Sequence, residues 1–171
     1  SLGNQPGIGM WNLSKIVDIF ARYNSDSENM QKILETYPAI FLYEYRKELL
    51  EKCGLYKMDL ADEELLKSML NMLVETQLDY TQFFRALSRY EKSSLILKDL
   101  HHEKLKEWLV LYDQRLTIEE VEESERHLRM LEKNPKYILR NYIAQKAIED
   151  EEFLSNIFEV LIRPCDEWPD F

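Results

Sequence analysis

Apolar residues recur at three- and four-residue steps along most of this chain, a period typical of helices that bury one face. We find no convincing strand, no internal repeat and no low-complexity linker. Only 4 Gly and 5 Pro occur in 171 residues, which leaves little material for hairpin turns. The pattern predicts an all-α fold, a multi-helix bundle of about eight or nine helices, in a single domain spanning residues 1–171.

The first half of the chain opens with an unusually apolar helix. Residues 10–23 are apolar around more than half of the helix circumference, so we expect this helix to take a buried position. Capping residues at 25–27 predict a second helix to about Thr36, and Pro38 suits the first position of a third. Gly54 should end that helix in a left-handed conformation.

Aspartates precede three later helices. Asp59 or Asp62 opens one, Asp79 caps a short one, and Asp150 caps the last, which Pro164 ends. Between the second and third of these helices, residues 105–116 form a further apolar stripe at helical spacing. These helices and this stripe place the following residues in the core: Leu65, Leu66, Met69, Leu70, Leu73, Phe83, Phe84, Leu87, Leu105, Trp108, Leu109, Tyr112, Leu116, Phe153, Ile157, Val160 and Leu161. The apolar pattern is lost over residues 90–98, which predicts a loop.

Two more helix starts are expected between these elements. The spacing of Thr117 and Glu120 is that of a capping box, which predicts a helix to about Glu132. Asn134 before Pro135 predicts the next start, because proline lacks an N–H that would have no partner in a first turn. Residues expected on its apolar face are Ile138, Leu139, Tyr142, Ile143 and Ala147.

Arg140 and Asn141 lie side by side within this predicted apolar helix. Such a pair can bond to the ends of neighbouring helices or point at a ligand. We favour the structural role, since one guanidinium can satisfy several helix-end carbonyl groups at once.

The charge balance argues against nucleic acid as a partner. The chain carries 32 acidic and 22 basic side chains, a formal net charge of −10, whereas binding to a phosphate backbone needs clustered positive charge. No apolar run approaches the roughly 20 residues of a membrane span. We therefore expect no membrane association and a cytoplasmic location.

The two cysteines indicate neither a zinc site nor a disulfide framework. Cys53 and Cys165 are far apart in the sequence and form no C-x-x-C pair. Cys53 has apolar neighbours and is interpreted as a core residue. Cys165 follows a proline near the C-terminal end and is expected to be exposed.

Other candidate sites have simpler explanations. Gly7-Ile8-Gly9 lacks the third glycine and the preceding strand of a phosphate-binding loop. His101 and His102 are adjacent, whereas two zinc ligands on a helix are four residues apart, and His127 stands alone among charges. Acidic groups at residues 62–64 and 119–123 fit helix first turns, where the helix dipole favours carboxylates. We expect no catalytic, cofactor-binding or metal-binding residue.

Five segments, in order, resemble the selenoprotein O family of kinase-like proteins, which transfer AMP from ATP to protein hydroxyl groups. The first is Gly3-Asn4-Gln5-Pro6 with Trp11 and Asn12, the second is Asp79 to Leu87, and the fourth is Asn134-Pro135 with Arg140 and Asn141. The third comprises Trp108, Tyr112, Arg115 and Leu116, and the fifth Arg163-Pro164 with Asp166-Glu167. Together they span almost the whole chain.

The resemblance implies that the catalytic residues of the family lie before residue 1. The expected role of this chain is then a C-terminal helical scaffold, similar to the large-lobe and C-terminal helices of a kinase-like fold. Ser1-Leu2 is open to interpretation as an expression scar. The signature residues Asn4, Gln5, Pro6, Trp11, Asn12, Asn134, Pro135, Arg140 and Asn141 would be structural. ATP and Mg²⁺ or Mn²⁺ are implied for the complete family member only, as are protein substrates.

Partners and alternatives follow from the same picture. The expected partner is the remaining, N-terminal part of the same protein, with self-association through bare apolar surface as a second outcome. The alternative is a stand-alone helical module that docks a partner protein in an apolar groove. Bare surface on the first helix would favour the scaffold, and a groove among later helices would favour the module.

Overall fold

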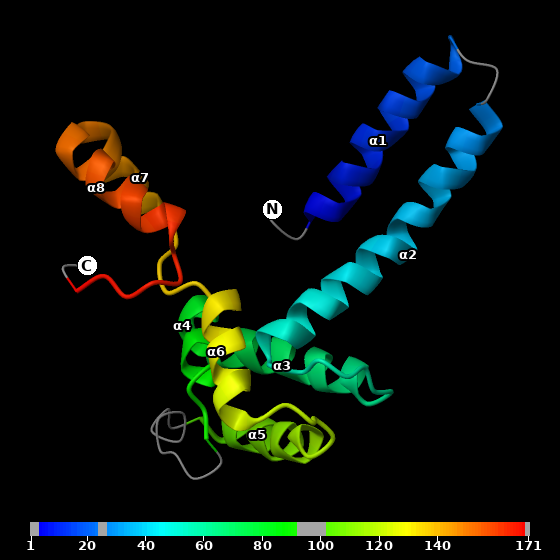
Figure 1. Ribbon diagram of the computed structural model, residues 1–171. Coiled ribbons are helices and arrows are strands. Elements are labelled where there is room, and N and C mark those ends of the chain that lie inside the picture. The colour runs from blue at the N-terminus through cyan, green and yellow to red at the C-terminus, as the bar shows by residue number, and fades with distance from the viewer. Residues whose placement is uncertain (1–3, 24–26, 92–101, 170–171) are drawn as a thin grey trace. The chain divides into compact units, whose positions relative to one another are not determined.

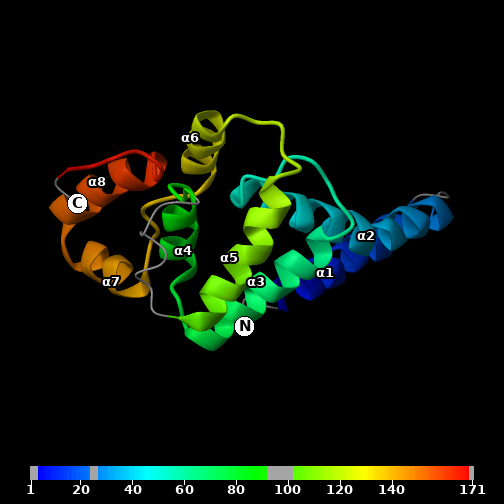
Figure 2. The ribbon, with the colours of Figure 1, turned by 90° about the horizontal axis from the view of Figure 1, so that it is seen from below.

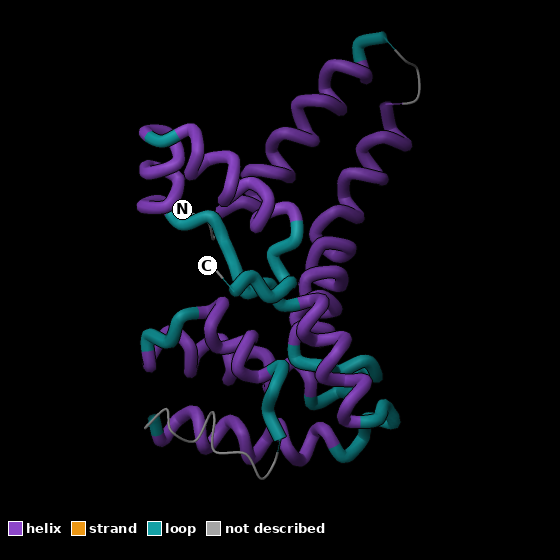
Figure 3. The backbone as a smooth tube through the Cα atoms, turned by 60° about the vertical axis from the view of Figure 1, so that its left-hand side comes forward, coloured by secondary structure: helices purple, strands orange, loops and turns teal. Residues whose placement is uncertain are grey.

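The computed structural model describes residues 4–23, 27–91 and 102–169, and within these ranges the secondary structure is entirely helical, as predicted (Figures 1 and 3). The predicted loop at 90–98 lies mostly outside the described residues, as does His101. The helices described are α1 (Gln5–Ala21), α2 (Ser27–Lys52), α3 (Asp62–Thr76), α4 (Tyr80–Leu87), α5 (Glu103–Leu116), α6 (Glu123–Lys133), α7 (Asn141–Glu149) and α8 (Glu151–Ile162).

Packing divides the chain into two compact units, residues 1–48 and 49–171, with the boundary inside α2. The first unit contains α1 and most of α2. No residue of α1 is buried, and Trp11 is 61% exposed, so the bare apolar surface expected on the first helix is present. Gly9 approaches α2 so closely that a Cβ atom there would lie 2.6 Å from the Tyr37 hydroxyl.

The prediction of two helices meeting at Pro38 is wrong, because α2 continues through this residue. A proline inside a helix gives up one backbone hydrogen bond, at a cost of about 3 kcal/mol. Thr36, which could have capped a new helix, instead donates its hydroxyl to the carbonyl of Ile33 within the helix, at 2.7 Å. Without a cap before Pro38, the chain keeps its helical path.

The prediction of a left-handed cap at Gly54 is confirmed. Its φ is +69°, and its N–H donates to the carbonyl of Glu51 at 3.0 Å. The N–H of Leu55 donates to the carbonyl of Leu50 at 2.9 Å, which completes a Schellman motif at the end of α2. This turn ends α2 within the second unit.

The main core of the second unit forms where α3, α4 and α5 meet; α3 and α5 run side by side (Figure 2). The predicted stripe on α5 is confirmed, with Trp108 and Tyr112 buried and stacked at a centroid separation of 5.0 Å. Their polar atoms are satisfied, since Trp108 Nε1 donates to Leu65 O at 3.1 Å and the Tyr112 hydroxyl donates to Cys53 O at 2.6 Å. Burying each such ring contributes about 1.5–3 kcal/mol.

The helix predicted at the Thr117 capping box is wrong in its start, because residues 117–122 form a loop and α6 begins at Glu123. The Thr117 hydroxyl donates back to Gln114 O at 2.7 Å and the Glu120 carboxylate pairs with Lys57, so the two groups of the capping box do not cap a helix here. The neighbouring Glu119 carboxylate also binds groups of other segments. It accepts from the backbone N–H of Tyr56 at 3.0 Å and from Arg115 Nη1 at 2.9 Å. Arg115 is buried between Glu119 and Asp62, and this tertiary pairing outweighs the local cap.

The helix predicted to start at Pro135 is also displaced, since α6 ends at Lys133 and α7 begins at Asn141. The segment between them is extended, because buried Asn134 is held by distant groups and does not cap a following turn. Of the predicted apolar face only Ala147 is buried, whereas Tyr142 is 71% exposed.

The last two helices, α7 and α8, lie side by side and share a small second core built on Ala147, Ile157 and Val160. Both predicted caps of the later helices are confirmed. Asp79 accepts from Gln82 N at 3.0 Å, and Asp150 accepts from Phe153 N at 2.9 Å.

Candidate functional site

Three of the five signature segments converge in the second unit. The segment 79–87 forms α4 and its cap, residues 134–142 form the extended connection into α7, and residues 163–167 follow α8. The contacts that join them are made mainly by the polar side chains of Arg85, Asn134 and Glu167. The sequence resemblance did not predict that these segments are neighbours.

Arg85 links α4 to the two other segments. Its Nη1 donates to the carbonyl groups of Leu131 at 2.9 Å and Asn134 at 3.1 Å, which belong to the C-terminal end of α6. Its Nη2 donates to the carbonyl of Cys165 at 3.1 Å and to Glu167 Oε1 at 3.0 Å. A cation at a helix C-terminus is also favoured by the helix dipole. Arg85 therefore joins α4 to the end of α6 and to residues 165 and 167, and these contacts use four of its five N–H donors.

Asn134 is 0% exposed and connects α2, α4 and α6. Its Nδ2 donates to Lys52 O at 2.8 Å and to Ser88 Oγ at 3.0 Å, and its Oδ1 accepts from Lys52 Nζ at 3.2 Å. Asparagine suits this place because it can donate and accept through one planar group. All three of these contacts are with other parts of the second unit.

Glu167 is the anionic partner of three cations. Its Oε2 pairs with Lys136, and its Oε1 accepts from Arg85 at 3.0 Å and from Arg89 at 2.7 Å. Hydrogen bonds from Lys136 and then Arg85 lower the pKa of the Glu167 carboxyl to about 2. The carboxylate itself is 54% exposed, so salt and water weaken these pairs.

The prediction that Arg140 and Asn141 lie side by side within a helix is only partly right: Arg140 is the extended N-cap residue of α7, and Asn141 is the first residue of that helix. Arg140 does not satisfy helix-end carbonyl groups. Its Nη2 donates to the Asp79 carboxylate at 2.6 Å, which joins the start of α7 to the start of α4. The pKa of Asp79 is lowered first by the hydrogen bond from the Gln82 amide and also by Arg140. Asn141 is exposed, and the role expected for Arg140 belongs to Arg85.

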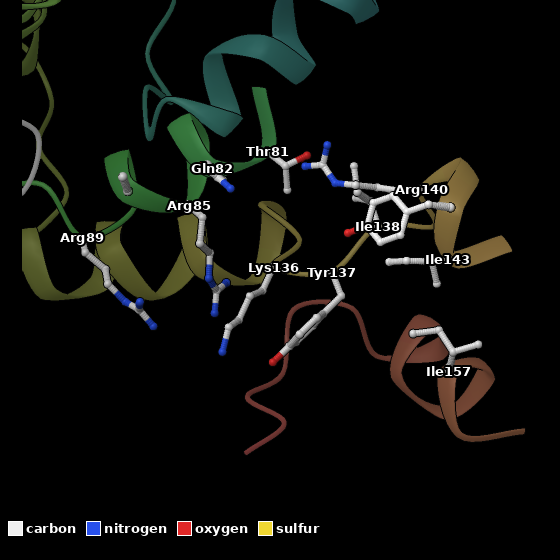
Figure 4. Close-up of a pocket in the computed structure, with 12 residues that line it drawn as sticks. Thr81, Gln82, Arg85, Arg89, Lys136, Tyr137, Ile138, Arg140, Ile143 and Ile157 are labelled. Carbon is white, nitrogen blue, oxygen red and sulfur yellow. The ribbon is translucent and has the colours of Figure 1, made fainter. Parts of the chain in front are cut away.

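A pocket of about 480 Å³ opens between α4, the connection 136–140, α7 and α8. Figure 4 shows Arg85 from α4 and Arg89 from the turn after it reaching toward the side of Lys136, while Ile143 and Ile157 lie at the opposite end. Four of its lining residues are cationic, the three just named and Arg140, and none is acidic. Such a lining suits an anionic group with an apolar neighbour and disfavours a metal cation.

The remaining signature residues lie in the first unit. Asn4 precedes α1 without a side-chain capping bond, Gln5 and Pro6 form the start of the helix, and Trp11 and Asn12 are exposed on it. None of them contributes to the pocket lining.

The other candidate residues form no reactive centre among the described residues. No group of three or more His, Cys, Asp or Glu side chains there is suited to a metal ion. Gly7 and Gly9 are helical residues of α1, and His102 is exposed beside the start of α5. His127 was expected to be solvated, but it is half-buried with Nε2 3.0 Å from Tyr90 O.

The cysteines have little thiolate character. Cys53 is buried as predicted, and burial raises the pKa of its thiol to about 12. Cys165 was expected to be exposed but is half-buried, and its Sγ donates to Glu132 O at 3.0 Å. Burial raises its pKa as well. Neither thiol has the environment of a nucleophile.

Sequence reasoning missed the buried arginines. Arg115 bonds to Asp62 at 2.6 Å, and Arg126 donates to the Tyr112 hydroxyl and to Tyr90 O, each at 3.1 Å. Arg85 is 9% exposed. One available signal was their position, because Arg85 and Arg115 stand among apolar residues of an otherwise buried helix face.

Comparison with known proteins gives evidence on the family of this chain that does not depend on the structure. Residues 1–162 match the family model described as protein adenylyltransferase SelO. The chain is similar to a protein nucleotidyltransferase YdiU of Flavobacterium johnsoniae, with 30% identity over 99% of this chain, and to one of Pectobacterium atrosepticum, with 34% identity over 98%. In both cases it spans 36% of the relative's length. None of the described helices is long and apolar enough to cross a membrane. With nearly all of its length matched by one family model, this chain belongs to the SelO family of protein adenylyltransferases.

Proposed function

We propose that this chain is the helical scaffold segment of a SelO-type protein adenylyltransferase, and that its own side chains do not carry out AMP transfer. In the complete protein, AMP would pass from ATP to Ser, Thr or Tyr hydroxyl groups of protein substrates, with Mg²⁺ or Mn²⁺, in the cytoplasm. The observation that carries the proposal is the use of the signature side chains. Arg85, Asn134, Arg140 and Glu167 bind other helices or their connections.

The residues present do not fit a metal–nucleotide centre. Within the described part of the chain no set of carboxylate, histidine or cysteine ligands converges, and the pocket between α4 and α8 is cationic. A divalent ion bound to phosphates needs oxygen ligands, and cations in the same place would repel it. We therefore assign no step of AMP transfer to this segment.

The direct test is AMP transfer by the purified chain. Residues 1–171 would be incubated with α-labelled ATP, Mg²⁺ or Mn²⁺ and a generic protein acceptor, after circular dichroism has shown a cooperative thermal transition. We expect no incorporation of label. Robust labelling by this folded chain would overturn the scaffold assignment.

A second test uses a complete SelO-type protein that contains this segment. Arg140→Gln removes the pair with Asp79 but no carbonyl contact. A scaffold role predicts a change in kcat of less than about threefold at unchanged KM for ATP, since no transition-state contact is lost. A fall in kcat of about a hundredfold in a protein of unchanged thermal stability would show that Arg140 acts in catalysis.

The bare apolar face of α1 fits the same proposal. Trp11, Ile19 and Phe20 are all more than half exposed, and relatives have additional length that this chain does not match. We propose that this face packs on the remaining part of such a protein. In the purified chain the same bare face should cause self-association, which sedimentation measures and which the double variant Trp11→Ser with Phe20→Ser should reduce. A monomer at all concentrations would contradict the expectation that this face binds another protein surface.

The alternative, a helical protein-interaction module, is favoured by one observation. The pocket beside α4 is lined by later helices of the second unit and not by α1. A docking role for this pocket is compatible with the scaffold assignment, because the two involve different surfaces of the chain.

A further inference from the structure

The pocket beside α4 has more positive charge than its anionic partners offset. Arg85, Arg89 and Lys136 share a single carboxylate, that of Glu167, which is not itself a lining residue. This excess stands out in a chain with a formal net charge of −10. Three cations with one carboxylate form a site that favours a second anionic group.

Arg85 has an unused donor at this place. The residue is 9% exposed, and its buried Nε has no hydrogen-bond partner among the described residues. The other four donor positions of the guanidinium are occupied by carbonyl groups and by Glu167. A buried donor without a partner destabilises the protein relative to one that is hydrogen-bonded. The guanidinium is therefore fixed in place with hydrogen-bonding capacity left over.

The chain already shows which chemistry these cations accept. The segment 163–168, which turns at Pro164 and Cys165, contacts this cationic end. The Cys165 carbonyl accepts from Arg85 Nη2 at 3.1 Å, and the Pro164 carbonyl accepts from the backbone N–H of Lys136 at 2.8 Å. The Glu167 side chain of this segment then binds the three cations. Backbone carbonyl groups and a carboxylate together are the features of an acidic peptide, which a free inorganic anion does not offer.

The opposite end of the pocket is apolar. Ile143 from α7 and Ile157 from α8 line it a short way from the cationic end (Figure 4). A volume of about 480 Å³ is within the usual range for ligand pockets and accommodates a few side chains. An occupant with a carboxylate at one end and an aliphatic side chain at the other would contact both halves.

We propose that this pocket binds an acidic segment of a partner protein, with one carboxylate on Arg89 and Lys136 and a neighbouring aliphatic side chain against Ile143 and Ile157. Glu167 competes for the same cations, so the chain's own C-terminal segment limits the affinity for the partner. The inference does not depend on AMP transfer, because it concerns binding alone.

The test is fluorescence anisotropy with the 171-residue chain and a fluorescein-labelled hexapeptide, Gly-Asp-Glu-Ile-Leu-Gly, blocked at both ends. The comparison peptide has Asn and Gln in place of Asp and Glu. We expect the acidic peptide to bind at least tenfold more tightly at 50 mM salt, and the difference to shrink at 150 mM as charges are screened. Equal binding of both peptides, or none by either, would overturn the proposal.

Two variants of the protein locate the site. Arg89→Gln with Lys136→Gln removes two partly exposed cations and should weaken binding of the acidic peptide at least tenfold. The matched control, Lys67→Gln with Lys106→Gln, removes the same charge from exposed positions of α3 and α5 and should change affinity less than twofold. Equal effects of the two pairs would mean that binding reflects overall charge only.

A third variant predicts a change in the opposite direction. Glu167→Gln releases the cations from their internal partner and should tighten binding about threefold or more, because the competing carboxylate is gone. Its side chain is half exposed, so the fold should persist, as circular dichroism can verify. Weaker binding by this folded variant would contradict competition. Displacement of the peptide by inorganic phosphate as effectively as by unlabelled peptide, at matched ionic strength, would contradict peptide recognition.

Discussion

At the scale of single residues, the second unit is organised by buried arginines. Arg85, Arg115 and Arg126 each lie among apolar side chains, and each donates to carbonyl or carboxylate oxygens from other parts of the unit. A buried charge is costly unless it is paired and fully hydrogen-bonded. These residues therefore fix which helices meet, because few arrangements supply the required oxygens.

The two asparagines of one signature segment should differ sharply in their effect on stability. Asn134→Ala removes the contacts of a fully buried side chain to Lys52 and Ser88, so we expect a loss of about 2–4 kcal/mol in the free energy of unfolding. Asn141→Ala, at the exposed start of α7, should change it by less than about 0.5 kcal/mol. Urea denaturation measures both. Equal effects would contradict the structural assignment of Asn134.

The Glu167 interactions should depend on pH in a defined window. The pKa of this carboxyl is lowered from 4.5 to about 2, so its stabilising contribution is complete above pH 4.5 and is lost as pH falls toward 2. NMR titration of the side-chain carbonyl carbon should show a midpoint near pH 2. Lys136→Gln should move this midpoint upward, because Lys136 is the largest cause of the shift. A midpoint that stays near 4.5 in the unmodified chain would exclude these ion pairs.

At the scale of elements, helix boundaries follow local chemistry only where no distant group competes. Asp79, Asp150 and Gly54 end or begin helices as predicted. The capping box of Thr117 and Glu120 does not, because Glu120 pairs with Lys57 and the Thr117 hydroxyl donates to Gln114 O. The adjacent Glu119 is bound by Arg115 and by backbone donors of the loop after α2. A local cap contributes about 1 kcal/mol, which a set of partly buried charge-assisted bonds exceeds.

Two glycine substitutions should have opposite effects. Gly54→Ala places a Cβ at φ +69°, 2.5 Å from Met130 Sδ and 2.8 Å from Arg126 Cγ, and should lower the free energy of unfolding by about 2–3 kcal/mol. Gly7→Ala, in α1 with nothing within 4 Å of the new atom, should stabilise that helix by up to about 1 kcal/mol. Thermal and urea unfolding followed by circular dichroism test both. A neutral Gly54→Ala variant would contradict the left-handed cap.

At the scale of the whole molecule, the two units differ in how much they bury. The second unit contains the large aromatic core and a smaller one between α7 and α8, whereas α1 in the first unit buries no residue. Local opening is easiest where few apolar contacts must be broken. The units should therefore differ in stability, although one helix passes from one to the other.

Hydrogen exchange followed by mass spectrometry should resolve this difference. We expect amides of α1 to exchange at least tenfold faster than those of α3 and α5, whose faces are buried. Peptides of α3 serve as the internal reference for global unfolding. Equal protection of α1 and α5 would mean that α1 is covered, by a second copy or by another segment.

The pattern of apolar residues was sufficient to predict the helical class, the α5 stripe and the inward residues of α8. It did not predict the continuity of α2 at Pro38 or the extended segment after Asn134. At Pro38 the helix continues with Thr36 bonded inside it, whereas the conformation at Asn134 depends on Lys52 and Ser88, which are far away in the sequence. The signature residues were found from the sequence, but the pocket lined by two of the signature segments, 79–87 and 134–142, was not.

The sequence by itself determined that this chain is helical, which faces of α3 and α5 are buried, and to which family it belongs, because period and motif are local properties of the chain. Tertiary structure decided which polar residues meet. Arg85, Asn134 and Glu167 are separated by dozens of residues, and only packing brings their donors and acceptors within hydrogen-bond distance. Where hydrogen-bonding groups are buried, the need to satisfy them overrides local propensity.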